Sequence, residues 1–314
     1  MQSASPLIVV LGPTATGKTA FAAQAAHQVN GEIISADSRQ VYKNLNIGTG
    51  KDYHAYVVNG KTIPYHLIDI AEPTERYHVH RFIKDCKEAI DQIAAKGCIP
   101  IMCGGSGLYL QAVLKDYQYT AIPVNLDIRE ELTDKSLPQL QAYFSQLPKT
   151  TYAQIADLST TKRCIRAIEI ATWLGRNSLP EPQKVLRTPL IIGLKNSIEE
   201  RRKNIANRLD QRLQNGLIDE VQLLLAKGIC ANQLIYFGLE YKFVTYYLQG
   251  QFSIAELKEK LTIAIQQFAK RQMTYFRKME REGCNIIWLD ASLPMEDMLN
   301  SFRHHFAVLI KNKI

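Results

Sequence analysis

The segment GPTATGKT, residues 12–19, constrains this chain more than any other part of its sequence. It follows the apolar run Leu7–Leu11 and precedes an alanine-rich stretch of helical character, the setting in which G-x-x-x-x-G-K-[ST] is a phosphate-binding loop. Its glycines permit backbone angles that other residues avoid, so the loop amides and the helix N-terminus can turn toward an anion. The segment therefore predicts a strand–loop–helix unit that binds phosphate, carried either by a nucleotide or by another diphosphate ester.

Each residue of this loop contributes to the predicted phosphate site. Lys18 would place an ammonium group on the phosphate oxygens, and Thr19 would offer its hydroxyl to Mg²⁺. The complete predicted anion-binding segment is Gly12, Pro13, Thr14, Ala15, Thr16, Gly17, Lys18 and Thr19. The alternative is a glycine-rich turn that binds nothing, and the agreement of strand, spacing, lysine and threonine argues against it.

Short apolar runs alternate with helical patterns along much of the chain. The runs that we interpret as buried strands are Leu7–Leu11, 32–36, 66–70, 99–103, 190–194 and 285–289. Because strands that alternate with helices form parallel sheets, the pattern predicts an α/β core. The alternation stops between about 116 and 189, a polar stretch that we expect to be an insertion of short helices. The predicted domains are a core of residues 1–115 and 190–314 and an insertion of residues 116–189.

Composition limits the class of protein. The 314 residues are 46% hydrophobic and 22% charged, which is typical of a soluble globular chain, and no run of eighteen apolar residues predicts a membrane span. The N-terminus shows no signal-peptide pattern. The six cysteines are scattered without a C-x-x-C pair, which favours reduced thiols in the cytoplasm over disulfides or zinc. The net charge of +8 would indicate a polyanionic partner only where the basic residues cluster.

Two polar residues follow predicted strands, at the edge of the sheet where open α/β proteins bind ligands. Asp37, in ADSRQ, could act as a base or hydrogen-bond acceptor beside the phosphate, or it could only form an Asx-turn or a helix cap. Ser106, in GGSGLY, could contact a phosphate or a substrate, or it could only cap the next helix. The local sequence leaves both pairs of alternatives open.

Clustered basic residues mark three predicted helices. In TKRCIRAIEI, Arg163 and Arg166 could bind nucleic-acid phosphates, or they could only pair with Glu169. Helix 198–215 carries several arginines, one of which could reach a diphosphate, although a solvated face is the usual explanation. Helix 254–282 has a basic side that includes a tyrosine and suits RNA, with the same alternative. The expected core positions of this long helix are Leu257, Leu261, Ile265, Phe268 and Phe276.

Taken together, these segments resemble the tRNA dimethylallyltransferases, also called tRNA isopentenyltransferases. The matching stretches occur in the family's order and span nearly the whole chain; they are GPTATGKT, ADSRQVYKNLNIGTGK, PYHLIDI, GGSGLYL, KRCIRAIEI, RLQNGLIDEV and AKRQMTYFR. The resemblance implies a nucleotide-kinase-like P-loop core and a helical insertion that grips the tRNA anticodon stem-loop. It also implies transfer of the dimethylallyl group of dimethylallyl diphosphate to N6 of the adenosine on the 3′ side of the anticodon, with release of diphosphate.

The resemblance assigns a task to individual residues. Asp37 would accept the proton of the adenine amine. Lys18, the loop amides, Thr19 with Mg²⁺, and Arg208 on helix 198–215 would stabilise the leaving diphosphate. Ser106 stands where the family usually has Thr, and its hydroxyl would keep the contact. The tRNA-contacting positions carried over from the family are Asp37, Ser38, Arg39, Gln40, Ser106, Arg129, Lys162, Arg163 and Arg166. Among them, the amide of Gln40 would read an adenine edge.

Two segments depart from the family pattern. GTGKD, residues 48–52, stands where the family commonly has GTAKP, and FGLEYK, residues 237–242, stands where it has a GYKE-like run. We expect both departures to bear on the RNA preference more than on the chemistry, because they fall near the expected tRNA and prenyl surfaces. No Cys/His pair has the zinc-finger spacing of the eukaryotic relatives, which favours a bacterial-type enzyme.

Three other functions fit parts of the sequence. An isopentenyltransferase acting on free adenylate would share the loop and the aspartate, but the basic insertion and the AKRQMTYFR helix favour a large RNA acceptor. A nucleotide kinase would need a basic lid over ATP, for which the insertion is too long. A non-catalytic RNA-binding switch would need a second nucleotide-specificity motif, and none is seen. The expected partners are therefore tRNA and dimethylallyl diphosphate, bound by a monomer with Mg²⁺ as cofactor.

Overall fold

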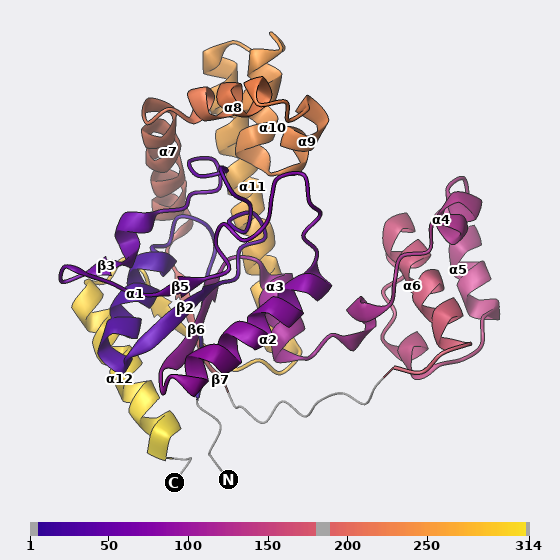
Figure 1. Ribbon diagram of the computed structural model, residues 1–314, viewed down its shortest axis with the longest axis horizontal. Helices are drawn as coiled ribbons and strands as arrows, with labels where there is room; N and C mark the ends of the chain where they lie inside the picture. Colours follow the sequence, from indigo (N-terminus) through magenta and orange to yellow (C-terminus); the bar gives the residue numbers. More distant parts are fainter. Residues whose placement is uncertain (1–5, 180–188, 312–314) are drawn as a thin grey trace. The chain divides into compact units, whose positions relative to one another are not determined.

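The computed structural model describes residues 6–179 and 189–311 (Figure 1). The chain divides into two compact units, which we call the core unit (Met1–Lys115 with Val185–Ile314) and the insertion unit (Asp116–Lys184). The first division follows Lys115. The predicted second boundary, between 189 and 190, adjoins residues 180–188, which lie outside the described residues.

The core unit is organised around a parallel sheet whose described strands have the order β5-β2-β6-β1-β7-β8. The strands are β1 Leu7–Leu11, β2 Gly31–Ser35, β5 Tyr65–His66, β6 Ile99–Gly104, β7 Pro189–Lys195 and β8 Ile286–Asp290. The middle strands are buried along nearly their whole length, as continuous apolar runs predict for a sheet covered on both faces. The predicted α/β class with a parallel sheet is therefore confirmed.

Helices cover both faces of the sheet (Figure 1). They are α1 Lys18–Val29, α2 Val79–Ala95, α3 Gly107–Leu114 and α12 Met295–Lys311. On one face α1 and α12 pack together, and the rings of Phe21 and Phe302 meet edge to face with centroids 6.2 Å apart. On the other face α2 approaches the sheet closely enough that Cys86 Sγ lies 3.5 Å from Met102 Sδ.

One predicted strand is wrong in its extent. The run 66–70 was expected to be a strand, but the strand is Tyr65–His66. The chain leaves the strand direction because Leu67 and Asp69 have φ angles of +61° and +56°. This turn brings the Asp69 carboxylate onto the buried ammonium group of Lys51, so an apolar-looking run forms a polar anchor instead.

Five described helices of the core unit lie between β7 and β8: α7 Ile198–Gln214, α8 Leu217–Ala226, α9 Ala231–Tyr236, α10 Leu239–Leu248 and α11 Ile254–Arg281. In Figure 1, α7 to α10 gather at one end of the sheet, and α11 runs from this group back to α3. Ser197 and Ser253 each begin a helix with a capping box, as their spacing from a glutamate three residues later predicts. A small hairpin, β3 Val57–Val58 with β4 Lys61–Thr62, follows the 3₁₀ turn Tyr53–Tyr56.

The insertion unit is built of short helices, as predicted. Its described helices are α4 Leu126–Leu132, α5 Leu137–Gln146 and α6 Thr161–Leu174, with 3₁₀ turns at Gln118–Ala121 and Thr151–Gln154. The unit has its own apolar core, in which Leu132, Leu140 and Ile168 are fully buried. Among all the helices described in the chain, none is both long and apolar enough to cross a membrane.

Candidate active site

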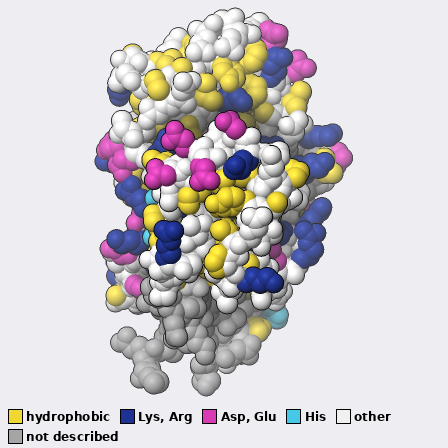
Figure 2. Space-filling view, turned by 90° about the vertical axis from the view of Figure 1, so that its right-hand side faces the viewer, with side chains coloured by type: hydrophobic (Ala, Val, Ile, Leu, Met, Phe, Trp, Pro, Cys, Tyr) yellow, Lys and Arg dark blue, Asp and Glu magenta, His cyan; other side chains and the backbone are white. Residues whose placement is uncertain are grey.

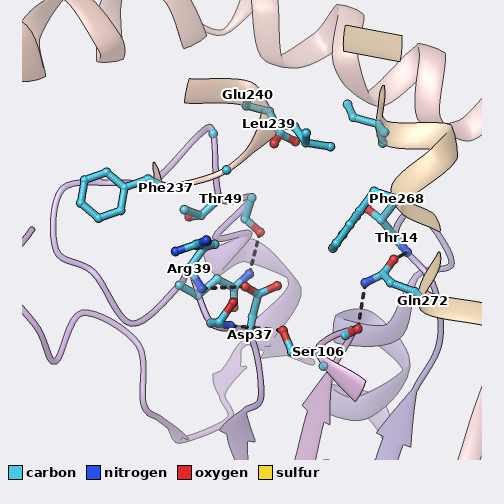
Figure 3. Close-up of a pocket in the computed structure, with 18 of the residues that line it drawn as sticks. Thr14, Asp37, Arg39, Thr49, Ser106, Phe237, Leu239, Glu240, Phe268 and Gln272 are labelled. Carbon is cyan, nitrogen blue, oxygen red and sulfur yellow. Dashed lines mark hydrogen bonds between the residues drawn. The ribbon is translucent and has the colours of Figure 1, made fainter. Parts of the chain in front are cut away.

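A cavity of about 630 Å³ opens at the carboxyl ends of the sheet strands in the core unit (Figure 3). This edge is where open α/β sheets bind ligands. The side chains predicted for catalysis all line this one cavity; they are Lys18, Asp37, Ser106 and Arg208, joined by Thr19. Residues nearly two hundred positions apart in sequence thus meet at a single site.

The phosphate-binding loop turns from β1 into α1. It comprises Gly12, Pro13, Thr14, Ala15, Thr16, Gly17, Lys18 and Thr19, the last two already in the first turn of the helix. A Cβ atom at Gly12 would lie 2.4 Å from the carbonyl oxygen of Leu194 in β7, so only glycine fits there. Lys18 Nζ donates to the Pro13 carbonyl at 2.6 Å, so an incoming anion would compete with this carbonyl for the ammonium group.

Two cations at the loop are poorly hydrated. Burial lowers the pKa of Lys18 to about 8. Burial, followed by the neighbouring charge of Arg212, lowers the pKa of Arg208 to about 10. The Arg208 guanidinium donates to the Thr14 hydroxyl at 3.3 Å. Within the described part of the chain neither cation forms an ion pair, so a bound anion would supply the missing counter-charge.

Asp37 and Ser106 lie side by side at this edge (Figure 3). Asp37 Oδ1 accepts a hydrogen bond from the Arg39 amide at 2.9 Å, so the Asx-turn considered for Asp37 is present. This bond fixes one carboxylate oxygen in a residue that lines the cavity, and the turn is therefore compatible with a role as acceptor. Ser106 begins α3 without capping it through its side chain. Its hydroxyl instead accepts from the Ser38 amide at 3.3 Å and ties the two loops together.

The neighbouring segment from Ser38 to Gln40 also lines the cavity, with differing freedom. Both ends of the Gln40 amide are engaged: Oε1 accepts from the Ser35 hydroxyl at 2.9 Å, and Nε2 donates to the Gly50 carbonyl at 3.1 Å. Reading a base would require breaking these bonds. Arg39 places its guanidinium over the ring of Tyr236, 4.5 Å from the centroid, and both side chains line the cavity.

One wall of the cavity is apolar. Phe268 of α11 was expected in the core, but it is 41% exposed and projects into the cavity (Figure 3). The periodicity of a helix cannot distinguish a side chain that faces a core from one that faces a cavity. Leu239, Ile265 and Leu108 also contribute to the lining. The site thus combines an anion-binding floor with an apolar wall, a combination suited to a diphosphate attached to a small hydrocarbon group.

Sequence reasoning missed two residues that hold this geometry in place. Gln272 of α11 is buried, accepts from the Thr14 amide at 2.9 Å and donates to the Gly105 carbonyl at 2.9 Å. It therefore joins the phosphate-binding loop to the loop before Ser106. Glu220 of α8 accepts hydrogen bonds from three consecutive backbone amides, residues 46–48, and so fixes the loop that ends at Gly50. Both lie within motifs quoted above, but only their long-range contacts reveal what they do.

In the insertion unit, two of the three predicted RNA-binding arginines contact a buried carboxylate. Glu169 accepts from Arg129 Nε at 2.8 Å and from an Arg166 terminal nitrogen at 3.1 Å, and its side chain has no exposed surface. Arg166 also donates to the Ile122 carbonyl at 2.6 Å. The local pairing considered for Arg166 and Glu169 is therefore present, and it includes Arg129 as well.

Arg163 and Lys162 are arranged differently on the same helix. The Arg163 side chain is 61% exposed and pairs with the half-exposed Asp157 at 3.0 Å. Lys162 is exposed. Figure 2 shows described lysine and arginine side chains lying among acidic and apolar ones. The exposed pair Lys162 and Arg163 is thus better placed to meet a polyanion than the two arginines held by Glu169.

The fold defines a P-loop α/β protein, and its cavity joins the phosphate-binding loop to an apolar wall. The sequence profile of the family described as IPP transferase matches residues 40–279. The chain belongs to the IPP transferase family.

Individual relatives cover nearly the whole chain. It is 49% identical over 294 residues to tRNA dimethylallyltransferase 2 of Bacteroides fragilis, an alignment that covers 94% of this chain and 95% of the relative. It is 50% identical over 291 residues to a protein of the same name in Phocaeicola vulgatus, with 93% and 94% covered. The crystal structure of the full-length tRNA isopentenylpyrophosphate transferase of Bacillus halodurans is similar with a TM-score of 0.72 at 30% identity, covering 98% of both chains.

Proposed function

We infer that this protein is a tRNA dimethylallyltransferase. It transfers the dimethylallyl group of dimethylallyl diphosphate to N6 of the adenosine 3′-adjacent to the anticodon and releases diphosphate. The observation that carries this proposal is a cavity of the core unit that Lys18, Arg208 and Asp37 line together with apolar side chains. Relatives near 50% identity, named for action on tRNA, support this function over prenylation of free adenylate or nucleotide phosphorylation.

The proposed reaction needs help at both ends of the transferred group. The exocyclic amine of adenine is a weak nucleophile because its lone pair is delocalised into the ring. Asp37 accepts the amine proton while the new C–N bond forms and the bond from carbon to diphosphate oxygen breaks. Lys18, Arg208 and the loop amides stabilise the negative charge that develops on the departing diphosphate. The Asx-turn holds the carboxylate, and Ser106 holds the loop that carries it.

Mg²⁺ is the proposed cofactor, with Thr19 as the residue of this chain that holds it. The Thr19 side chain lines the cavity in the first turn of α1. Mg²⁺ prefers hydroxyl, phosphate and water oxygens over dedicated protein cages, so a single threonine next to a diphosphate site fits this ion. When bound, the ion supplies neutralising charge for the diphosphate.

The acceptor adenosine must leave the stacked anticodon loop to reach the cavity, which costs a few kcal/mol. We propose that Ser38, Arg39 and Gln40 contact the extruded nucleotide, and that Lys162 and Arg163 contact tRNA phosphates. Arg129 and Arg166 shape the insertion unit that presents these contacts. The scattered, unpaired cysteines are compatible with work in the cytoplasm, where we propose the protein acts as a monomer.

One assay separates this function from its alternatives. The protein is given labelled dimethylallyl diphosphate with Mg²⁺ and either unmodified tRNA or AMP, and ATP in a separate reaction. We expect label on tRNA alone, at an adenosine. Label on AMP would indicate an adenylate prenyltransferase, and ATP turnover without prenyl transfer would indicate a kinase. Binding of tRNA without any turnover would indicate a non-catalytic RNA-binding switch.

A further inference from the structure

The two departures from the family pattern meet in the structure at Gly50. This residue has a φ angle of +68°, in the left-handed region. A Cβ atom there would lie 1.9 Å from a terminal nitrogen of Arg212 and 2.4 Å from a terminal nitrogen of Arg208. Two guanidinium groups therefore pack directly on the glycine backbone. An alanine, which the family commonly has at this point of GTAKP, would occupy the space that these groups fill.

The second departure supplies the partner of Arg212. An Arg212 terminal nitrogen donates to Glu240 Oε1 at 2.6 Å, and the two side chains are only 13% and 17% exposed. Glu240 belongs to FGLEYK, the other segment that differs from the family. Gly50 makes room for Arg212, and Glu240 holds it there. The two segments are therefore coupled through one arginine, which itself comes from a third segment, α7.

The charges at this point do not balance. Arg208 and Arg212 lie next to each other, both line the cavity, and within the described residues one carboxylate, Glu240, pairs with one of them. Water cannot fully compensate the excess, because both side chains are largely buried. An arginine has five donors in a fork that matches phosphate oxygens, and the Glu240 contact engages one nitrogen of Arg212. Among the described residues no further hydrogen bond is formed by the Arg212 guanidinium, so its other donors could bind an anion in the cavity.

We propose that Arg212 is a second diphosphate-binding arginine of this site, placed beside Arg208 by Gly50 and Glu240. The proposal rests on the proposed function, because it takes the ligand of the cavity to be a diphosphate. It assigns a physical role to both departures: Gly50 leaves the space that Arg212 fills, and Glu240 holds Arg212 at the site for the leaving group. Glu240 is a positioning residue, since it acts through Arg212, and Gly50 acts by leaving space.

The test measures the Kd of inorganic pyrophosphate with Mg²⁺ by calorimetry, without tRNA and without turnover. Arg212→Met should weaken binding roughly 10- to 100-fold, the effect of losing a hydrogen bond between charged groups. Lys203→Met removes an exposed cation from the same helix and is the control for net charge, with little change expected. Arg212→Met combined with Glu240→Gln removes both charges, avoids an unpaired carboxylate, and should show the same loss.

The role of Gly50 is tested in the same assay. Gly50→Ala should weaken pyrophosphate binding at least several-fold, and its effect should shrink when Arg212→Met is already present. Gly60→Ala is the matched control, because Gly60 has a φ angle of +74° with no atom within 4 Å of the added methyl group. That variant carries the same backbone strain and should leave the Kd unchanged.

The outcomes distinguish this proposal from the proposed function. If the unsubstituted protein does not bind pyrophosphate, both fail. If it binds pyrophosphate and Arg212→Met binds equally well, only the role of Arg212 fails. A raised KM for tRNA with an unchanged Kd for pyrophosphate would assign Arg212 to RNA phosphates and overturn the proposal. Recovery of wild-type affinity in the double variant would mean that net charge matters and a direct contact does not, which would also overturn it.

Discussion

Arginines of the core unit and of the insertion unit look alike in the sequence but are used in opposite ways. In the core unit, Arg208 and Arg212 both line a cavity, and among the described residues a carboxylate, Glu240, pairs with Arg212 but not with Arg208. In the insertion unit, Arg129 and Arg166 both donate hydrogen bonds to Glu169, and Arg166 also donates to backbone carbonyls. The first pair has donors left for a ligand, whereas the second pair is largely committed to holding its own fold.

The contrast between the two pairs indicates that unused hydrogen-bond donors, more than charge alone, mark a basic residue as a binding residue. A guanidinium whose N–H donors are bound to a buried carboxylate stabilises the fold. A guanidinium that is poorly hydrated and has no counter-charge is suited to bind an anion. Substitutions should therefore separate into two groups: changes in the cavity lower activity and leave stability nearly unchanged, and changes around Glu169 do the reverse.

The largest expected effect lies on the cavity side. Asp37→Ala should lower kcat for prenyl transfer roughly 10²- to 10⁴-fold, the usual contribution of general acid–base catalysis. The unfolding midpoint in urea should move little, because the carboxylate accepts a single local amide bond. Affinity for tRNA should remain. An unchanged kcat would reject the role of Asp37 as base, and loss of folding would place Asp37 with the structural group.

The second effect is on the insertion side. Glu169→Ala leaves two guanidinium groups without their acceptor and should cost about 3 kcal/mol, the lower end for breaking a buried ion pair, because both arginines keep some access to water. Hydrogen exchange of the α6 amides measures it, with Glu169→Gln as the milder control. With saturating tRNA, kcat should change little. If the α6 amides of Glu169→Ala exchanged as slowly as those of the wild type, the structural role assigned to Glu169 and its two arginines would be rejected.

Arg166→Ala should be intermediate, since it removes both an ion pair and bonds to backbone carbonyls. We expect it to destabilise the insertion unit by about 2 kcal/mol, within the usual range for losing hydrogen bonds of a charged group. The same exchange measurement on α6 detects it. If Arg166→Ala instead lowered tRNA affinity at unchanged protection, Arg166 would belong with the ligand-binding arginines.

The smallest effect is expected at the exposed end of α6. Arg163→Ala should leave stability unchanged, because its pair with Asp157 is exposed and such pairs contribute little. It should flatten the dependence of log K for tRNA on log[salt] by about 0.7 to 0.9, the equivalent of one phosphate contact. Adding Lys162→Ala should flatten it by a similar further step. If the slope of log K against log[salt] is unaltered in the double variant, both residues belong to a solvated face and do not contact tRNA phosphates.

Local pattern was enough to predict the elements that depend on local chemistry. The strand–loop–helix around Lys18, the capping boxes at Ser197 and Ser253 and the interruption of the sheet near residue 116 follow from residue type and spacing. The run 66–70 was misjudged because positive φ angles at Leu67 and Asp69 serve a contact with Lys51, far away in the sequence. Phe268 was misplaced because a cavity and a core attract the same residue types.

The candidate site was predictable where a motif carries its own mechanism, as for Lys18, Thr19 and Asp37. It was not predictable where the function of a residue is to touch another segment. Gln272 joins two loops that precede it by more than 160 positions, and Glu220 fixes a loop more than 170 positions away. Gly50 appeared only as a departure from a family pattern, and its significance depends on two guanidinium groups that no spacing rule places beside it.

The pairing of β1 with β7 has a consequence for how the protein is made. The register pairs Leu7 with Pro189 and Leu11 with Gly193. Nearly two hundred residues must therefore be synthesised after β1 before β7 is available to pair with it. The helices α4 to α6 emerge earlier and close their own apolar cluster from nearby residues. During synthesis the nascent chain would therefore carry a finished helical module while its oldest strand still lacks a partner on one side, an interval in which chaperones would find it exposed.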